Sequence, residues 1–246
     1  MECFIVREPD IDLALNSLVL RGDEARHAVR VLRLREGEKL MATTLNGTCY
    51  RASMGRSEQV SKTEWVAHCQ IEEILPEHNE PDINVQLIQG IPHQQSKLEE
   101  IAEKVTEMGI RSIIPITTKR TEKKTFNRER LIRILENGSK QTYRARLPKL
   151  SEVMSLEEAL AHAKSEGRKI IMLHESASLQ DSLASALHEE SGNKISLVIG
   201  PEGGFEEVEI MLAVHSFGTR IASLGPRRMR AETAAIMAVS LALGMN

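Results

Sequence analysis

"LVIGPEGGFEEVEI" at residues 197–210 and "IASLGPRRMRAETAAIM" at residues 221–237 repeat one pattern. In each stretch an apolar run ends at a glycine, Gly200 or Gly225, which is followed by a proline and then by charged residues. Proline fixes its own φ, lacks an N–H and pushes the preceding residue toward extended geometry. We therefore predict two buried strands that end in rigid turns. Because ligands of open α/β sheets bind beyond the carboxyl ends of the strands, both turns are candidate binding loops.

The sequence around these loops alternates between strand-like and helix-like segments. Apolar runs that predict buried strands lie at 83–88, 112–116, 169–173, 195–199 and 219–224. Residues 96–108 carry one apolar stripe that stops at Gly109, and Ser155 and Glu158 have the spacing of a capping box. The alternation predicts an α/β fold with a mostly parallel sheet covered on both faces. The last segment, "AAIMAVSLAL", is apolar almost all round, so we expect it in the core or in a subunit interface.

The N-terminal part of the chain has a different pattern. Short alternating apolar segments, broken by glycines at 22, 37, 47 and 55, predict a small β-rich domain over residues 1–74. Residues 75–82, "LPEHNEPD", combine two prolines with several acids, and we expect a linker there. Residues 83–246 then form the second predicted domain.

The basic residues are clustered, although the whole chain has a formal net charge of -3, with 32 Lys and Arg against 35 Asp and Glu. Residues 119–149 hold eleven Lys and Arg against three acids, and arginines also gather over residues 21–35. A solvated helix face is the alternative for either cluster alone, but two clusters in one chain favour phosphate contacts. The candidate phosphate-binding residues are Arg21, Arg26, Arg30, Lys119, Arg120, Lys123, Lys124, Arg144 and Arg146.

The cysteines and the apolar segments indicate the cellular compartment in which the protein works. Cys3, Cys49 and Cys69 are widely spaced and include no C-x-x-C pair, so neither a disulfide framework nor a metal site is predicted. The N-terminus lacks the pattern of a signal peptide, and no apolar stretch approaches the length of a membrane span. We therefore expect a soluble cytoplasmic protein without a metal.

The chemistry of the two loops restricts the class of ligand that could bind there. Gly203 and Gly204 let the backbone approach a ligand closely, and Glu202 supplies a carboxylate. Acids at the start of the following helix would repel a phosphate, so a ligand with a positive centre or neutral polar edges fits better. The second loop adds arginines beside Glu232 and Thr233, and the usual dinucleotide fingerprint G-x-G-x-x-G is absent.

These motifs resemble those of the SPOUT methyltransferases, and within them the ribosomal RNA small subunit methyltransferase E family. "LVIGPEGGF" and "SLGPRRMRAETAA" are similar to the two cofactor loops of that family, and "LHES" is similar to the loop after its middle strand. "KLEEIAEKVTEMGIRSIIPITTKR" resembles its first helix and second strand, and "RLPKL" resembles a segment before its middle helix. "ARHAVRVLRLREGEKL" resembles its PUA-like RNA-binding β-barrel, so the likeness extends over nearly the full length.

The resemblance implies a deep trefoil knot, bound S-adenosylmethionine, a homodimer, and methylation of uridine N3 in 16S rRNA within the small ribosomal subunit. By motif, the residues around the cofactor are Leu173, His174, Glu175, Ile199, Gly200, Pro201, Glu202, Gly203, Gly204, Leu224, Gly225, Met229, Arg230, Ala231 and Thr233. This chain departs from the pattern at Ala231, where threonine is more common, and at "TTKR", which replaces an acid-arginine pair.

For catalysis, the candidates are Arg230 and Glu232. Arg230 would stabilise the imide anion that forms when N3 loses its proton, and Glu232 is the rival as a general base. Alternatives left open are a ribose 2′-O-methyltransferase of the same fold, a non-catalytic rRNA-binding assembly factor, and a small-molecule enzyme with a phosphate-binding loop.

Overall fold

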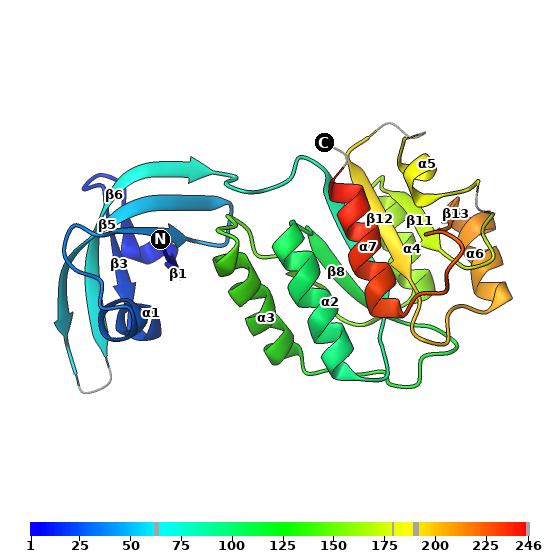
Figure 1. Ribbon diagram of the computed structural model, residues 1–246, viewed down its shortest axis with the longest axis horizontal. Coiled ribbons are helices and arrows are strands. Elements are labelled where there is room, and N and C mark those ends of the chain that lie inside the picture. The colour runs from blue at the N-terminus through cyan, green and yellow to red at the C-terminus, as the bar shows by residue number, and fades with distance from the viewer. Residues whose placement is uncertain (62–63, 179, 189–191, 245–246) are drawn as a thin grey trace. The chain divides into compact units, whose positions relative to one another are not determined.

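The computed structural model describes residues 1–61, 64–178, 180–188 and 192–244 (Figure 1). The chain divides into two compact units. Unit 1 contains Met1–Glu80 and Glu136–Leu147, and unit 2 contains Pro81–Leu135 and Pro148–Asn246. The division near residue 80 lies within the expected linker. The return of residues 136–147 to unit 1 differs from the sequence prediction, which assigned them to the second domain.

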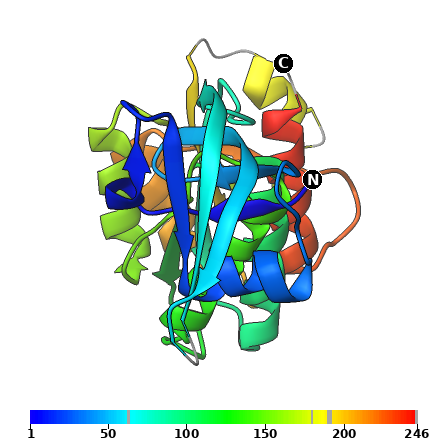
Figure 2. The same cartoon turned by 90° about the vertical axis from the view of Figure 1, so that its left-hand side faces the viewer.

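Unit 1 is built on one six-stranded sheet (Figure 2). Its strands are β1 (Cys3–Ile5), β2 (Ile11–Asp12), β3 (Ser17–Arg21), β4 (Lys39–Thr43), β5 (Thr48–Gln59) and β6 (Trp65–Pro76), in the order β1-β4-β5-β6-β3-β2. The β1–β4 pair is parallel and the other pairs are antiparallel. A 3₁₀ turn, η1 (Glu8–Asp10), precedes β2, and the helix α1 (Gly22–Arg26) continues directly into one π-helical turn, η2 (His27–Val31).

The core of unit 1 follows from the alternation of its strands. Leu18 and Leu20 of β3, Ala52 and Met54 of β5, and Ala67 of β6 are buried in one apolar cluster. Residues two apart on a strand share a face, so this alternation places the apolar side chains on one side of the sheet. The predicted β-rich N-terminal domain is confirmed.

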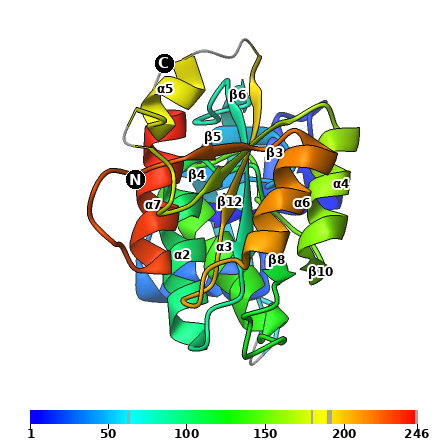
Figure 3. The same ribbon diagram turned by 90° about the vertical axis from the view of Figure 1, so that its right-hand side faces the viewer.

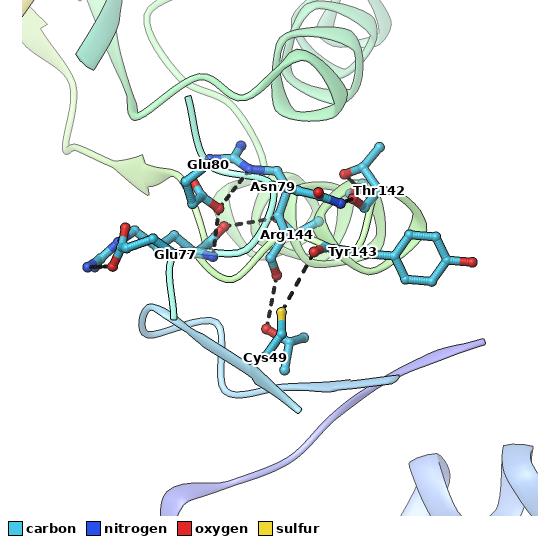
Figure 4. Close-up of polar contacts among 11 residues, drawn as sticks. Cys49, Glu77, Asn79, Glu80, Thr142, Tyr143 and Arg144 are labelled. Carbon is cyan, nitrogen blue, oxygen red and sulfur yellow. Dashed lines mark hydrogen bonds and ion pairs between the residues drawn. The ribbon is translucent and has the colours of Figure 1, made fainter. Parts of the chain in front are cut away.

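Residues 142–147 are fastened into unit 1 by polar contacts (Figure 4). The side chains of Arg144 and Glu80 are 1% and 4% exposed, and they form an ion pair with 2.7 Å between Arg144 Nη2 and Glu80 Oε2. Glu80 Oε1 also accepts the backbone N–H of Arg146 at 2.9 Å, and the Arg146 guanidinium pairs with Glu77. Thr43 Oγ1 donates to the carbonyl of Arg144 at 2.9 Å. The acids of the expected linker therefore serve as counter-ions for this segment.

These contacts correct one prediction. Arg144 was expected to bind RNA phosphate, but its side chain is buried against Glu80 and does not reach the surface. The neighbouring sequence places Arg144 in a basic cluster, whereas its ion-pair partner, Glu80, lies 64 positions earlier in the chain. Arg146 is partly exposed and is held by Glu77.

Unit 2 is a parallel α/β sheet, as predicted. Its strands are β7 (Asn84–Gly90), β8 (Ser112–Thr117), β9 (Lys149–Leu150), β10 (Met154–Ser155), β11 (Lys169–Leu173), β12 (Lys194–Ile199) and β13 (Arg220–Ala222). They are ordered β10-β8-β7-β12-β11-β13, with β9 beside β8, and every described pair is parallel. The five predicted strands all form, as β7, β8, β11, β12 and β13.

Helices cover both faces of this sheet (Figure 3). They are α2 (Gln95–Met108), α4 (Leu156–Ser165), α5 (Leu183–His188), α6 (Glu207–Phe217) and α7 (Ala231–Leu243). The remaining helix, α3 (Arg128–Gln141), begins in unit 2 and ends in the segment assigned to unit 1. α4 and α6 pack together on one face, and α2 and α7 pack together on the other. α2 ends at Gly109 with φ 105°, and Ser155 and Glu158 form the predicted capping box of α4.

The apolar helix α7 lies in the core of unit 2. It packs against α2, α5, β7 and β12, which explains why its sequence shows no polar face. Ile236, Met237 and Leu241 remain half-exposed. No helix in the described residues is both long and apolar enough to cross a membrane.

Candidate active site

A cavity of about 710 Å³ lies beyond the carboxyl ends of three neighbouring strands of unit 2. The loops after β11, β12 and β13 all contribute to its wall, so both Gly-Pro loops meet there. Arg120, from the loop after β8, completes the lining. Its position matches the ligand sites of open α/β sheets, and its volume is that of a small-molecule site.

The structure gathers the predicted cofactor residues around this cavity. Of that set, all except Thr233 line it. Thr233 is exposed on the first turn of α7. The sequence reasoning missed further lining residues, namely Ala177, Phe205, Ser223, Pro226, Arg227, Arg228 and Ala234. Most of them are sequence neighbours of the predicted motifs, so extending each motif by one or two residues would have identified them.

The first Gly-Pro loop is crowded at Gly200 and has a left-handed backbone at Gly204. A Cβ on Gly200 would lie 3.1 Å from the Cα of Gly204. A Cβ on Gly90, at the end of β7, would lie 2.4 Å from the ring of Pro201. Gly204 has φ 69°, which favours glycine, and its N–H donates to the Pro201 carbonyl at 2.9 Å. The loop is therefore a tight turn packed directly against the neighbouring strand end.

Glu202 fastens this loop to the beginning of α2. Its Oε2 accepts the backbone N–H of His93 at 3.1 Å, and its Oε1 accepts from Lys97 Nζ at 3.1 Å. Burial opposes ionisation of Glu202, but the backbone N–H donors and Lys97 outweigh it and lower the pKa of the carboxyl. Glu202 was predicted to offer its carboxylate to the ligand. It lines the cavity, but its two oxygens are engaged by the protein.

Arg120 packs against the first loop rather than standing free as a phosphate ligand. Its Nη1 donates to the carbonyl of Gly203 at 2.9 Å, and a Cβ on Gly203 would lie 2.9 Å from Arg120 Cβ. The neighbouring N–H of Lys119 donates to Glu209 Oε1 at 2.9 Å, and Glu209 also caps α6 through the N–H of Glu206. The loop after β8 is thus bonded both to the glycine segment, at Gly203, and to the first turn of α6, at Glu209.

Arg230 stands at the mouth of the cavity, at the N-cap of α7. Its side chain is 81% exposed, and its Nη1 lies 4.0 Å from Glu232 Oε1. Glu232 has a side chain only 10% exposed and does not line the cavity. Its Oε2 is buried without a hydrogen-bond partner in the described part of the chain. The two catalytic candidates are therefore neighbours, but only Arg230 faces the cavity.

The loop after β11 contributes His174 and Glu175. The Nδ1 atom of His174 accepts the backbone N–H of Ser176 at 3.2 Å and lies 2.7 Å from the Ser176 hydroxyl. Glu175 is exposed, with its Oε2 3.5 Å from Arg228 Nε. His174 therefore has a local structural partner in addition to its place in the lining.

The other predicted phosphate ligands are considered in each unit separately. In unit 1, Arg21, Arg26 and Arg30 are exposed. Arg21 pairs with Asp10, and Arg30 lies over the ring of Trp65 with 5.8 Å between its Cζ and the ring centre. In unit 2, Lys119 and Lys124 are exposed and Lys123 is half-exposed. Among the described residues, no group of three or more His, Cys, Asp or Glu could hold a metal ion.

The fold and the cavity are those of the RNA methyltransferase class. Residues 78–243 match the family model described as RNA methyltransferase domain, and residues 20–54 match the model described as RNA methyltransferase PUA domain. The first match covers the whole sheet of unit 2 and the cavity loops. The second match lies in unit 1.

Relatives specify the family further. Over 232 residues, 90% of this chain and 87% of the other, the chain is 29% identical to Ribosomal RNA small subunit methyltransferase E of Bacillus subtilis. It is 30% identical over 230 residues to the Synechocystis protein of that name, covering 91% of this chain and 72% of the other. A crystal structure of a Ribosomal RNA small subunit methyltransferase E from Neisseria gonorrhoeae bound to S-adenosyl methionine has a TM-score of 0.79 at 26% identity, covering 98% and 95%. The chain therefore belongs to the ribosomal RNA small subunit methyltransferase E family.

Proposed function

We propose that this chain uses S-adenosylmethionine to methylate N3 of uridine in the 16S rRNA of the small ribosomal subunit. The observation that carries the proposal is the convergence of both Gly-Pro loops on one cavity of about 710 Å³. The N. gonorrhoeae relative, solved with this cofactor, supports a shared cofactor. The names of the relatives support rRNA as the substrate class.

The residues of the cavity fit S-adenosylmethionine. At Gly200 and Gly204 the wall is backbone, because glycine has no side chain. Apolar side chains such as Ile199 and Met229 contribute to the same lining as the carboxylate of Glu175. This combination suits a ligand with an apolar stem, neutral polar edges and a positive centre. When bound there, the cofactor supplies a methyl group carried on positively charged sulfur.

Arg230 has the position required to assist the reaction at uridine. Methylation at N3 forms a nitrogen–carbon bond while the donor's sulfur–carbon bond to the methyl group breaks. N3 also loses its proton, so negative charge develops on the imide. Arg230 lines the cavity with a largely exposed guanidinium, and a fixed positive charge there stabilises that anion. The proton is released to water. Holding the base in line with the methyl group supplies much of the remaining acceleration.

Glu232 supports Arg230 in this scheme rather than taking the proton. Its carboxylate is buried outside the cavity lining, in the first turn of α7, where the helix dipole favours a negative charge. Its Oε1 lies 4.0 Å from the Arg230 guanidinium. We therefore assign Glu232 to orienting Arg230.

RNA binding is assigned to exposed basic residues of each unit. The N3 atom of a paired uridine is hidden in the base pair, so the target must be single-stranded or flipped out. Arg26 and Arg30 of unit 1, and Lys119 and Lys124 of unit 2, are exposed and suited to phosphate contacts that fix the RNA without reading its sequence. Aromatic residues make up only 3% of the chain, so guanidinium groups would supply most stacking.

A homodimer is part of the proposal. Ile236, Met237 and Leu241 on α7 are apolar and half-exposed, and we assign them to contact with a second copy. Light scattering coupled to size exclusion should give twice the mass of 27.5 kDa. A monomer at micromolar concentration would contradict this part. The trefoil knot that the resemblance implies stays a prediction.

The decisive test uses small ribosomal subunits from a strain that lacks this protein. Incubation with the purified chain and methyl-labelled S-adenosylmethionine should transfer the label to 16S rRNA. Nuclease digestion and mass spectrometry should then locate the methyl group on the uracil base. A methyl group on ribose would support a 2′-O-methyltransferase instead, and RNA binding without transfer would support an assembly factor. Either result would refute the N3 assignment.

A further inference from the structure

The lining of the cavity holds more arginines than binding of S-adenosylmethionine explains. Arg120, Arg227, Arg228 and Arg230 all line it, and the acids in the lining are Glu175 and Glu202. S-adenosylmethionine has two positive centres, at sulfur and at the amino group, and a single carboxylate. A cluster of guanidinium groups is unfavourable toward such a ligand. The arginines therefore indicate a second, anionic ligand at the same mouth.

Two of the four arginines already have an assigned role. Arg120 donates to the carbonyl of Gly203, and Arg230 faces the reacting base in the proposed mechanism. Arg227 and Arg228 differ from them. Arg227 is exposed and has no ion pair or hydrogen bond within the described residues. The side chains of Arg228 and Glu175 are 79% and 66% exposed, with 3.5 Å between Nε and Oε2. Such an exposed pair contributes little stability and separates easily.

The loop that carries these arginines is held in place from its first residues. Gly225 has φ 107°, and its N–H donates to Ser223 Oγ at 3.0 Å. Pro226 follows with a fixed φ, and α7 begins at Ala231. The two guanidinium groups are thus presented from a short segment anchored at both ends, which reduces the entropy lost when they bind a ligand.

We propose that Arg227 and Arg228 bind the backbone phosphates that flank the target nucleotide. This inference rests on the proposed function. A base that enters the cavity leaves its neighbouring phosphates at the mouth, where these arginines stand. Guanidinium groups match phosphate oxygens with two parallel hydrogen bonds. Such contacts set the register of the strand, so they position the uracil for Arg230 without reading its sequence.

The test compares Arg227→Ala and Arg228→Ala with Lys194→Ala. Lys194 is exposed at the first residue of β12, at the opposite end of that strand from the cavity, so its variant removes one positive charge elsewhere on unit 2. Binding to small ribosomal subunits that lack the modification is measured over a range of salt concentrations. Binding of S-adenosylmethionine is measured separately by calorimetry, which also reports that each variant is folded.

We expect each arginine variant to bind the subunits roughly tenfold more weakly, as for one lost charged hydrogen bond. The slope of log affinity against log salt should fall by about 0.7 per phosphate contact. The KM for the subunit should rise while kcat is retained, whereas Arg230 variants should lose kcat. S-adenosylmethionine affinity should be unchanged, and Lys194→Ala should behave as wild type in every assay.

Three outcomes would overturn the inference: unchanged subunit affinity, a weakening matched by Lys194→Ala, or a loss of S-adenosylmethionine affinity in the arginine variants. The last would mean that the guanidinium groups serve the cofactor carboxylate. Failure of the proposed function would look different, because wild type itself would then not bind the cofactor or not transfer the methyl group. Weaker subunit binding by the arginine variants would still support the phosphate contact in that case.

Discussion

Replacing Glu80 by glutamine should destabilise unit 1 far more than the loss of an ordinary surface charge. Glu80 and Arg144 are 4% and 1% exposed, with 2.7 Å between Oε2 and Nη2 and 3.2 Å between Oε1 and Nε. Glu80→Gln keeps the shape of the side chain but leaves a buried guanidinium without its counter-ion. Breaking a buried pair from one side costs about 3–5 kcal/mol, and we expect a loss in that range.

Urea unfolding followed by tryptophan fluorescence measures this loss. Trp65 is the single tryptophan of the chain and lies at the start of β6, so its signal reports on unit 1. The free energy of unfolding is obtained by linear extrapolation to zero urea. The matched control is Glu73→Gln, because the Glu73–Arg51 pair on the same sheet is about half exposed and should lose less than about 1 kcal/mol.

The double variant Glu80→Leu/Arg144→Met separates charge from packing. It removes both members of the pair, so no buried charge is left alone, and most of the lost stability should return. A loss below about 1 kcal/mol for Glu80→Gln would refute the reasoning. A double variant less stable than Glu80→Gln would show instead that the hydrogen bonds of this cluster matter more than its charge balance.

Three further predictions concern the active site. Gly90→Ala places a Cβ 2.4 Å from the Pro201 ring, so the first loop must shift. Because the shifted loop no longer matches the ligand, calorimetry should show S-adenosylmethionine binding weakened by about tenfold or more. Since the pKa of Glu202 is lowered in the fold, the stability from its bonds is present above the usual value of 4.5 and is lost as pH falls below it. Melting temperatures of wild type should therefore drop more steeply below pH 4.5 than those of Glu202→Gln, and parallel curves would contradict the assignment. Arg230→Lys should lower kcat by about 10²-fold or more, because lysine does not reproduce the guanidinium geometry, and full turnover in a single-turnover assay would remove Arg230 from the mechanism.

The strands and loops that hold the cavity were predictable because their signals are local. Proline chemistry at Pro201 and Pro226 determines where the strands end, and parallel strands bring their carboxyl ends to one edge. Gly109 and the Ser155–Glu158 pair likewise act within one turn of their helices. Such features need no knowledge of distant partners, and the predicted elements formed where expected.

The roles of individual charged residues were less predictable because their partners are remote in sequence. Glu202 is engaged by His93 and Lys97, more than a hundred positions earlier, so its carboxylate holds the loop instead of the ligand. Arg144 looks like any member of a basic cluster until Glu80 is placed beside it. Charge patterns give a residue's chemistry, whereas burial and pairing determine what that chemistry does.

The return of residues 136–147 to unit 1 affects how the chain folds as it leaves the ribosome. When residue 80 has been synthesised, Arg144 and Arg146, the ion-pair partners of Glu80 and Glu77, do not yet exist. The backbone N–H of Gly47 also lacks its acceptor, the carbonyl of Ala145. The nascent first unit must wait for more than fifty further residues, which also begin the second sheet, before its polar contacts close. The two units therefore cannot fold strictly one after the other. A stalled or shortened chain would leave Glu77 and Glu80 without the arginines that pair with them in the complete protein.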